Sequence, residues 1–159
     1  YLIENQNSII KVAENTAGSM SNKMPFIYTF PEFEGVAIRF KQQLNENSKR
    51  HACYNIIPEM NHNEIVPWVK KNTCVIPIFL NGKTSSRNTT RMQISIDSIK
   101  NNVEHFLELN VEDDLSYLNQ YFHFLHLVDW VSIIIAEQED VDPNDIALIN
   151  SLKEQLKNI

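Results

Sequence analysis

Two side chains that can move protons, the carboxylate of Glu46 and the imidazole of His62, stand on either side of a short apolar run. Carboxylate and imidazole groups act as general bases and acids when a fold places them against a substrate. Interconversion of an aldose and a ketose through an enediol requires such proton transfers, and this route needs neither a redox cofactor nor a metal ion. The pair therefore fits a sugar isomerase, provided that the fold builds a site around it.

Three further charged residues are weaker candidates. Glu59 and Glu64 flank His62, and such residues more often cap a short helix or face water than orient an imidazole. Lys153 follows an apolar helical stripe, and its position alone is typical of a solvated helix lysine. Spacing by itself therefore gives Lys153 no functional role and leaves Glu59 and Glu64 as secondary candidates for orienting the imidazole.

Three polar residues in a long apolar stretch, His123, His126 and Asp129, recur at every third position. On a helix they would spread over about 120° of its surface. A metal site normally draws another ligand from a second element, and the sequence offers no obvious one. We therefore expect no metal here, and we expect these side chains to bond to neighbouring backbone groups.

A polar stretch after Gly82 is rich in hydroxyl side chains and contains Arg87. Hydroxyl and backbone N–H groups near the start of a helix can bind phosphate. Gly82, Lys83 and Thr84 do not form a Walker motif, because the leading glycine is absent. Residues 84–90 are predicted to be a solvated loop, in which Arg87 is the candidate for a substrate contact.

The composition fits a globular domain with a sizeable core. The 159 residues are 43% hydrophobic and carry a formal net charge of −6, with no long basic run. Such a chain is a poor partner for nucleic acid or an anionic membrane surface. Cys53 and Cys74 are expected to be buried free thiols of a cytoplasmic protein, although a disulfide between them stays open. The first residues lack the basic start and apolar core of a secretory leader.

Hydrophobic periodicity predicts that helices and strands alternate along the chain. The predicted helices are 1–17, 36–47, 62–70, 92–103, 115–137 and 146–156, and the predicted strands are 26–30, 52–57, 73–80 and 105–109. Pro77 lies inside the third strand, which implies a sheet edge or a bulge there. The longest helix is apolar nearly all round but holds several polar residues, so we expect it to be central in the fold and not a membrane span.

This alternation is typical of an α/β fold in which a parallel sheet carries helices on both faces. Right-handed crossovers place the carboxyl ends of the strands at one edge of the sheet, where ligands bind in such folds. His62 follows the predicted strand 52–57 and is expected at this edge. The chain has three glycines and no glycine-rich phosphate loop, which disfavours a flavodoxin-like cofactor domain.

Several segments together match one family pattern, and the order of the second and third is more specific than any piece alone. They are Gly35–Ala37, Asn45–Lys49 (NENSK), Glu59–Glu64 (EMNHNE), Trp68, Asp129–Ser132 and Val141–Pro143. The chain, from about Met24 to Leu156, resembles the C-terminal sugar isomerase (SIS) domain of bifunctional phosphoglucose/phosphomannose isomerases. The resemblance implies a SIS-type three-layer sandwich over residues 23–159. Residues 1–22 would then be a helix and linker from a preceding domain.

The resemblance also implies roles for individual residues. Glu46 would take the C2 proton of an open-chain aldose 6-phosphate and return it at C1 through a cis-enediol. His62, similar to a histidine that the neighbouring subunit donates, would assist ring opening, and Lys153 would assist it and hold sugar oxygens. Asn144 stands where the family often has a threonine associated with accepting both C2 epimers, so it is a candidate substrate contact. This change bears more on mannose 6-phosphate than on glucose 6-phosphate.

Family members are homodimers with shared active sites, need no cofactor, and hold the phosphate mainly with Ser/Thr-rich loops of an N-terminal SIS domain. We therefore expect a sugar phosphate substrate, a role in glycolysis and gluconeogenesis, and little or no activity for this chain alone. The alternative from a different class is a non-catalytic SIS module that binds sugar phosphates and regulates a partner.

Overall fold

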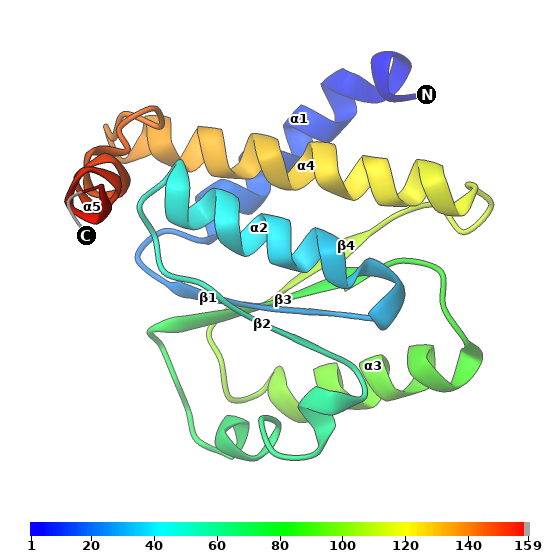
Figure 1. The fold of residues 1–159 in the computed structure, drawn as a ribbon. Coiled ribbons are helices and arrows are strands. Elements are labelled where there is room, and N and C mark those ends of the chain that lie inside the picture. Colours follow the sequence, from blue (N-terminus) through cyan, green and yellow to red (C-terminus); the bar gives the residue numbers. More distant parts are fainter. Residues whose placement is uncertain (158–159) are drawn as a thin grey trace.

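The computed structural model describes residues 1–157, in which helices and strands alternate (Figure 1). The α-helices are α1 (Leu2–Ser19), α2 (Glu34–Glu46), α3 (Ser86–Ile99), α4 (Tyr117–Gln138) and α5 (Ala147–Leu156). The strands are β1 (Met24–Thr29), β2 (Cys53–Ile56), β3 (Val75–Asn81) and β4 (Leu107–Asn110). Three short 3₁₀ helices complete the order: η1 (Pro31–Phe33), η2 (Glu59–Asn61) and η3 (Val66–Val69).

The four strands form one parallel sheet in the order β2-β1-β3-β4. Parallel neighbours require crossover connections, which α2 provides between β1 and β2 and α3 provides between β3 and β4. Each of the four predicted strands is present, with its ends displaced by at most two residues. The predicted α/β class with a parallel sheet is confirmed.

The sheet separates two apolar cores, because successive residues of a strand face opposite sides. Ile27 and Ile78 belong to the core shared with α1, α2 and α4. Tyr28 and Phe79, their neighbours in sequence, belong to a second core shared with α3, η2 and η3. Figure 1 shows α1, α2 and α4 on one face of the sheet and α3 on the other. This arrangement is the predicted three-layer sandwich.

Helix α4 is the central helix of the first layer, as its nearly continuous apolar sequence predicts. It packs against both α1 and α2, and Phe124, Val128 and Val131 on it are fully buried. Helix α1 contributes Ile9 and Ala13, also fully buried, to the same core. Among residues 1–157, no helix is long and apolar enough to cross a membrane.

Pro77 lies in the inner strand β3, at a position where β3 pairs with only one of its two neighbouring strands. Strand β3 pairs with β1 from Val75 onward, but its pairing with β4 begins at Ile78. A proline cannot donate to a ladder, and here the β4 side has no ladder yet. The predicted sheet edge is therefore present only around Pro77, because the short strand β4 does not extend far enough to pair there.

The start of α3 differs from the prediction. The helix begins at Ser86, six residues before the first apolar residue of its stripe, Met92. Ser85 is its N-cap, with Oγ accepting a hydrogen bond from the Asn88 N–H at 3.3 Å. Because the first turn is polar and faces solvent, hydrophobic periodicity does not detect it, and the predicted loop at 84–90 is wrong from Ser86 onward.

The segment that carries His62 is also not the predicted α-helix. It folds as η2 and η3 with a turn between them, and Pro67 lies at the start of η3. Met60 and Trp68 are buried in the second core, so the segment is packed although it is irregular.

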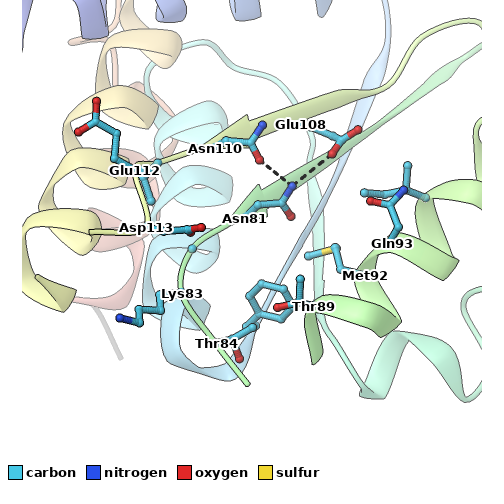
Figure 2. A pocket seen from close by; sticks show the side chains of 14 residues that line it. Asn81, Lys83, Thr84, Thr89, Met92, Gln93, Glu108, Asn110, Glu112 and Asp113 are labelled. Atoms are coloured by element: carbon cyan, nitrogen blue, oxygen red, sulfur yellow. Dashed lines mark hydrogen bonds between the residues drawn. The ribbon is translucent and has the colours of Figure 1, made fainter. Parts of the chain in front are cut away.

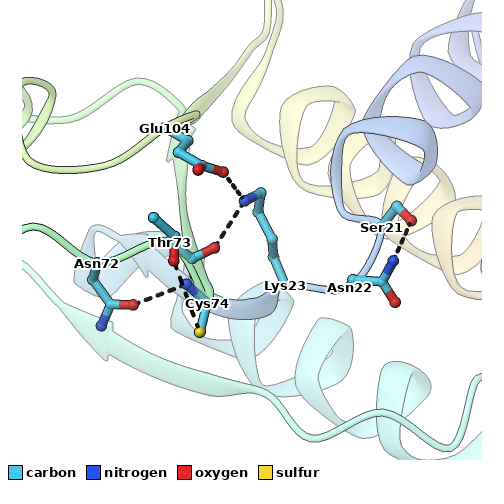
Figure 3. Close-up of polar contacts among 7 residues, drawn as sticks. All are labelled: Ser21, Asn22, Lys23, Asn72, Thr73, Cys74 and Glu104. Carbon is cyan, nitrogen blue, oxygen red and sulfur yellow. Dashed lines mark hydrogen bonds and ion pairs between the residues drawn. The ribbon is translucent and has the colours of Figure 1, made fainter.

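The predicted burial of both cysteines is wrong in part. Cys53 is half-buried and Cys74 is exposed, and both are free thiols. Figure 3 shows Cys74 at the start of β3, beside a polar junction centred on Lys23. The Lys23 Nζ donates to the carbonyl of Thr73 at 2.8 Å and pairs with Glu104, so this lysine ties the turn before β1 to the segments before β3 and β4.

Candidate active site

Glu46 is the last residue of α2, and its side chain is exposed at the amino-terminal edge of the sheet. The next residues fasten this end of the helix. Ser48, which is 1% exposed, donates from Oγ to the Ser132 carbonyl of α4 at 2.7 Å. The Asn47 Nδ2 donates to the Ser132 Oγ at 2.9 Å. The NENSK segment therefore fixes the position of Glu46, and Ser132, from another segment of the family pattern, is its anchor.

Lys49 joins this helix end to the loop before α5. It adopts a left-handed backbone conformation, with φ 55°, which turns the chain back toward β2. Its Nζ donates to the Glu46 carbonyl at 2.7 Å and to the Asp142 carbonyl at 2.8 Å. The loop residue Asn144 is exposed, and its backbone N–H is bonded to the Asp142 Oδ1 at 2.8 Å. The Lys49 ammonium group thus links the backbone at Glu46 to Asp142, the residue to which Asn144 is hydrogen-bonded.

Two adjoining shallow cavities, of about 510 and 370 Å³, are lined by Glu46 and by Ile149 of α5. Lys153 lies one turn beyond Ile149, on the same side of α5. Asp145, the neighbour of Asn144, also lines the smaller cavity. The structure therefore places Glu46 and the face of α5 that bears Lys153 at one exposed edge of the molecule, with Asn144 in the adjoining loop, but neither Lys153 nor Asn144 lines either cavity.

His62 lies in the other layer, away from Glu46. It follows η2 after the carboxyl end of β2, the predicted edge for this residue, whereas Glu46 ends a helix that returns to the amino ends of the strands. Among residues 1–157 the two candidate proton carriers therefore do not share a cavity. Arg87 is likewise separate from Glu46. It is exposed in the first turn of α3, which lies on the opposite face of the sheet from α2 (Figure 1).

Neither acidic neighbour of His62 contacts the imidazole. Glu59 is exposed, and among residues 1–157 its side chain makes no hydrogen bond or ion pair. Glu64 accepts hydrogen bonds from the Tyr28 hydroxyl at 2.8 Å and from the Asn55 Nδ2 at 2.7 Å. Burial and the nearby Glu64 charge raise the pKa of Tyr28, which keeps its phenol protonated as a donor.

A larger cavity, about 730 Å³, lies at the carboxyl ends of β3 and β4 beside the start of α3 (Figure 2). At its floor the Asn81 Nδ2 donates to the Asn110 Oδ1 at 2.9 Å. These amides could not be identified from the sequence, because isolated asparagines carry no recognisable spacing. Around them the cavity is acidic, with three carboxylates against one lysine: Glu108, Glu112, Asp113 and Lys83. This charge balance disfavours a phosphate group.

The three polar residues of α4 that were considered as metal ligands each contact a different side chain. The His123 Nδ1 lies 2.9 Å from the Tyr1 hydroxyl, the His126 Nε2 accepts from the Trp130 Nε1 at 3.2 Å, and Asp129 forms a bidentate pair with Arg39. These partners are side chains and not the expected backbone groups. Among residues 1–157, no cluster of His, Cys, Asp and Glu side chains has a geometry suited to a metal ion.

His123 gives the protein a testable dependence on pH. Burial, with a smaller contribution from His126, lowers the pKa of His123 below 6.5. As the pH falls below 6.5, the unfolded chain takes up this proton before the folded chain does, so the free energy of unfolding decreases until the folded pKa is passed. We expect the melting temperature to fall less between pH 7.5 and pH 5.5 in His123→Gln than in the wild type. His51→Gln, at an exposed site, should behave as the wild type, and equal slopes for all three proteins would contradict the prediction.

Comparison with known proteins identifies the family. Residues 9–156 match the model of the bacterial phospho-glucose isomerase C-terminal SIS domain. A bifunctional phosphoglucose/phosphomannose isomerase of Aquifex aeolicus is 33% identical over 98% of this chain and 49% of its own length. One from Caldicellulosiruptor bescii is 34% identical over 87% of this chain and 42% of its own length.

The fold is also similar to that of a solved structure. A glucose-6-phosphate isomerase like protein from Thermus thermophilus superposes with a TM-score of 0.70 at 16% identity, over 89% of this chain and 46% of that one. At this identity the likeness concerns the fold alone. The chain spans about half the length of the relatives that it matches. From the extent of the family match, the chain belongs to the bacterial phosphoglucose isomerase C-terminal SIS domains.

Proposed function

We propose that this chain is the C-terminal domain of an aldose–ketose isomerase that interconverts glucose 6-phosphate and fructose 6-phosphate. One observation carries the proposal: the exposed cavities beside Glu46 are lined on their other side by Ile149 of α5, the helix that bears Lys153. A base and a cation at one edge are the groups that an enediol reaction requires. The two relatives are bifunctional phosphoglucose/phosphomannose isomerases, which supports the same reaction class.

In the proposed reaction, Glu46 removes the proton from C2 of the open-chain aldose, and the electron pair of the C–H bond forms the C1–C2 double bond. The carbonyl oxygen at C1 takes up a proton from solvent water, which gives the cis-enediol. Glu46 then delivers its proton to C1 while the C2 hydroxyl gives its own proton to solvent water and becomes the ketose carbonyl. A positioned base contributes about 10²–10⁴-fold to such a step. Lys153 and Asn144 are proposed to hold sugar oxygens and to stabilise the charge that develops on them.

His62 is proposed to assist ring opening in the active site of a second copy. This assignment rests on its position, because His62 and Glu46 lie in different layers and at different edges of one chain. A homodimer with shared sites would reconcile the two positions. Arg87 could contact substrate only across the same kind of interface, because it too is separate from Glu46.

The remaining part of the site is proposed to come from an N-terminal SIS domain, which would hold the phosphate in a cytoplasmic enzyme of carbohydrate metabolism. Orientation of the substrate by its phosphate contributes a large part of catalysis in such reactions. The 159-residue chain alone is therefore expected to be nearly inactive.

A coupled assay of the full-length protein on glucose 6-phosphate and mannose 6-phosphate in parallel tests the proposal. We expect isomerisation of glucose 6-phosphate. The rate with mannose 6-phosphate should be lowered more than the rate with glucose 6-phosphate by the presence of Asn144. Binding of both sugar phosphates without conversion of either would contradict the proposal. If the isolated domain alone matched the rate of the full-length protein, the two-domain arrangement would be wrong.

A further inference from the structure

The segment around His62 combines an exposed imidazole with firmly held neighbours. The His62 side chain is exposed, and among residues 1–157 it makes no hydrogen bond, ion pair or ring contact. The residues on both sides of it are anchored to the body of the domain. Within residues 1–157 the imidazole therefore has no partner, but the anchored neighbours define its position.

On the C-terminal side, the anchor is the carboxylate of Glu64. One of its oxygens accepts a hydrogen bond from Tyr28 of β1 and the other accepts one from Asn55 of β2, at 2.8 and 2.7 Å. Tyr28 is fully buried, and its hydroxyl also accepts a hydrogen bond from the Trp68 Nε1 at 3.0 Å. Both oxygens of the carboxylate are therefore used to attach the segment to two neighbouring strands.

On the N-terminal side, the anchor is Asn61. Its Nδ2 donates to the Ser95 Oγ at 2.7 Å, and that hydroxyl donates to the Arg91 carbonyl of α3 at 2.8 Å. Met60, the preceding residue, is fully buried in the second core. His62 thus sits between an attachment to α3 and an attachment to the sheet.

We propose that Glu64 is a positioning residue for His62: its two hydrogen bonds hold the segment 59–69 so that the imidazole reaches the substrate bound to a second copy. The inference rests on the proposed function, because His62 must take part in the reaction for its position to matter. The physical reason is preorganisation, since a segment without regular secondary structure would otherwise spread the imidazole over many positions. Glu64 itself does not touch the substrate.

The experiment compares Glu64→Gln with Glu59→Gln in the full-length protein. Glutamine keeps the size of the side chain but places an NH₂ group where one carboxylate oxygen accepts a hydrogen bond, so one of the two attachments is lost. We expect Glu64→Gln to lower kcat about tenfold with little change in KM. Glu59→Gln, a matched change on the exposed side of the same segment, should stay within twofold of the wild type.

A double-mutant cycle shows whether Glu64 acts through His62. We expect His62→Ala to lower kcat at least tenfold, and we expect Glu64→Gln to add nothing in the His62→Ala background. An additive tenfold loss in that background would mean that Glu64 only supports the fold, and it would overturn the inference. Tyr28→Phe, which removes one of the same hydrogen bonds, provides a second variant, and thermal melts confirm that each protein is folded.

The two proposals fail in different ways. If His62→Ala is impaired but Glu64→Gln matches Glu59→Gln, the positioning role is wrong and the proposed isomerase mechanism stands. If His62→Ala is as active as the wild type, the ring-opening role of His62 is wrong, and the inference about Glu64 falls with it.

Discussion

Replacing Glu46 by glutamine in the full-length protein is expected to lower kcat for glucose 6-phosphate by about 10²–10⁴-fold. The amide keeps the shape of the side chain but cannot accept the C2 proton. Binding of the sugar phosphate should persist, because the substitution leaves the groups proposed to hold sugar oxygens in place. A coupled assay gives kcat, and calorimetry with fructose 6-phosphate gives the affinity.

The loss should not come from unfolding. Glu46 ends α2, where its negative charge meets the negative end of the helix dipole, so removing the charge should cost no stability. Glu137→Gln is the matched control, because Glu137 lies in the last turn of α4 and is also exposed. This control should keep wild-type activity. Unchanged activity in Glu46→Gln would exclude the catalytic role, and ligand binding without any turnover in the wild type would favour the regulatory module.

Replacing Gly82 by alanine is expected to destabilise the protein by about 1–3 kcal/mol, the usual cost of overpacking a core. A Cβ at Gly82 would overlap the Cε2 and Cζ atoms of Phe33. Phe33 is fully buried and packs against the rings of Tyr117, Tyr121 and Phe124, so it has no free direction in which to move. Either the aromatic rings around Phe33 or the loop after β3 must therefore shift to make room for the added Cβ. Urea denaturation of the two proteins measures the difference.

Gly18→Ala provides the control for this prediction. Gly18 lies within α1, and a Cβ there would have no atom within 4 Å. Alanine in a helix is favoured over glycine by about 0.5–1 kcal/mol, so this variant should be more stable than the wild type. If Gly82→Ala were as stable as the wild type, the loop after β3 would adapt without cost and the prediction would be wrong.

Much of the fold could be predicted from the sequence because the buried positions repeat regularly. In β1, Ile27 and Tyr28 face opposite cores, and in α4 the apolar side chains meet α1 and α2. The first turn of α3 and the segment 59–69 were not predictable in this way. Hydrogen bonds to capping groups and a few buried side chains hold them, and these leave no periodic pattern in the sequence.

For the candidate site, the sequence by itself determined the chemical groups: a carboxylate at Glu46, an imidazole at His62 and an ammonium at Lys153. Only the tertiary structure decided which of them are neighbours. Glu46 and the face of α5 that bears Lys153 meet at one edge because Lys49 joins the end of α2 to the loop before α5. His62 lies in the opposite layer because β2 delivers it to the other edge of the sheet. The physical reason is that spacing along a chain sets local geometry, whereas the crossovers of a parallel sheet set which distant ends meet.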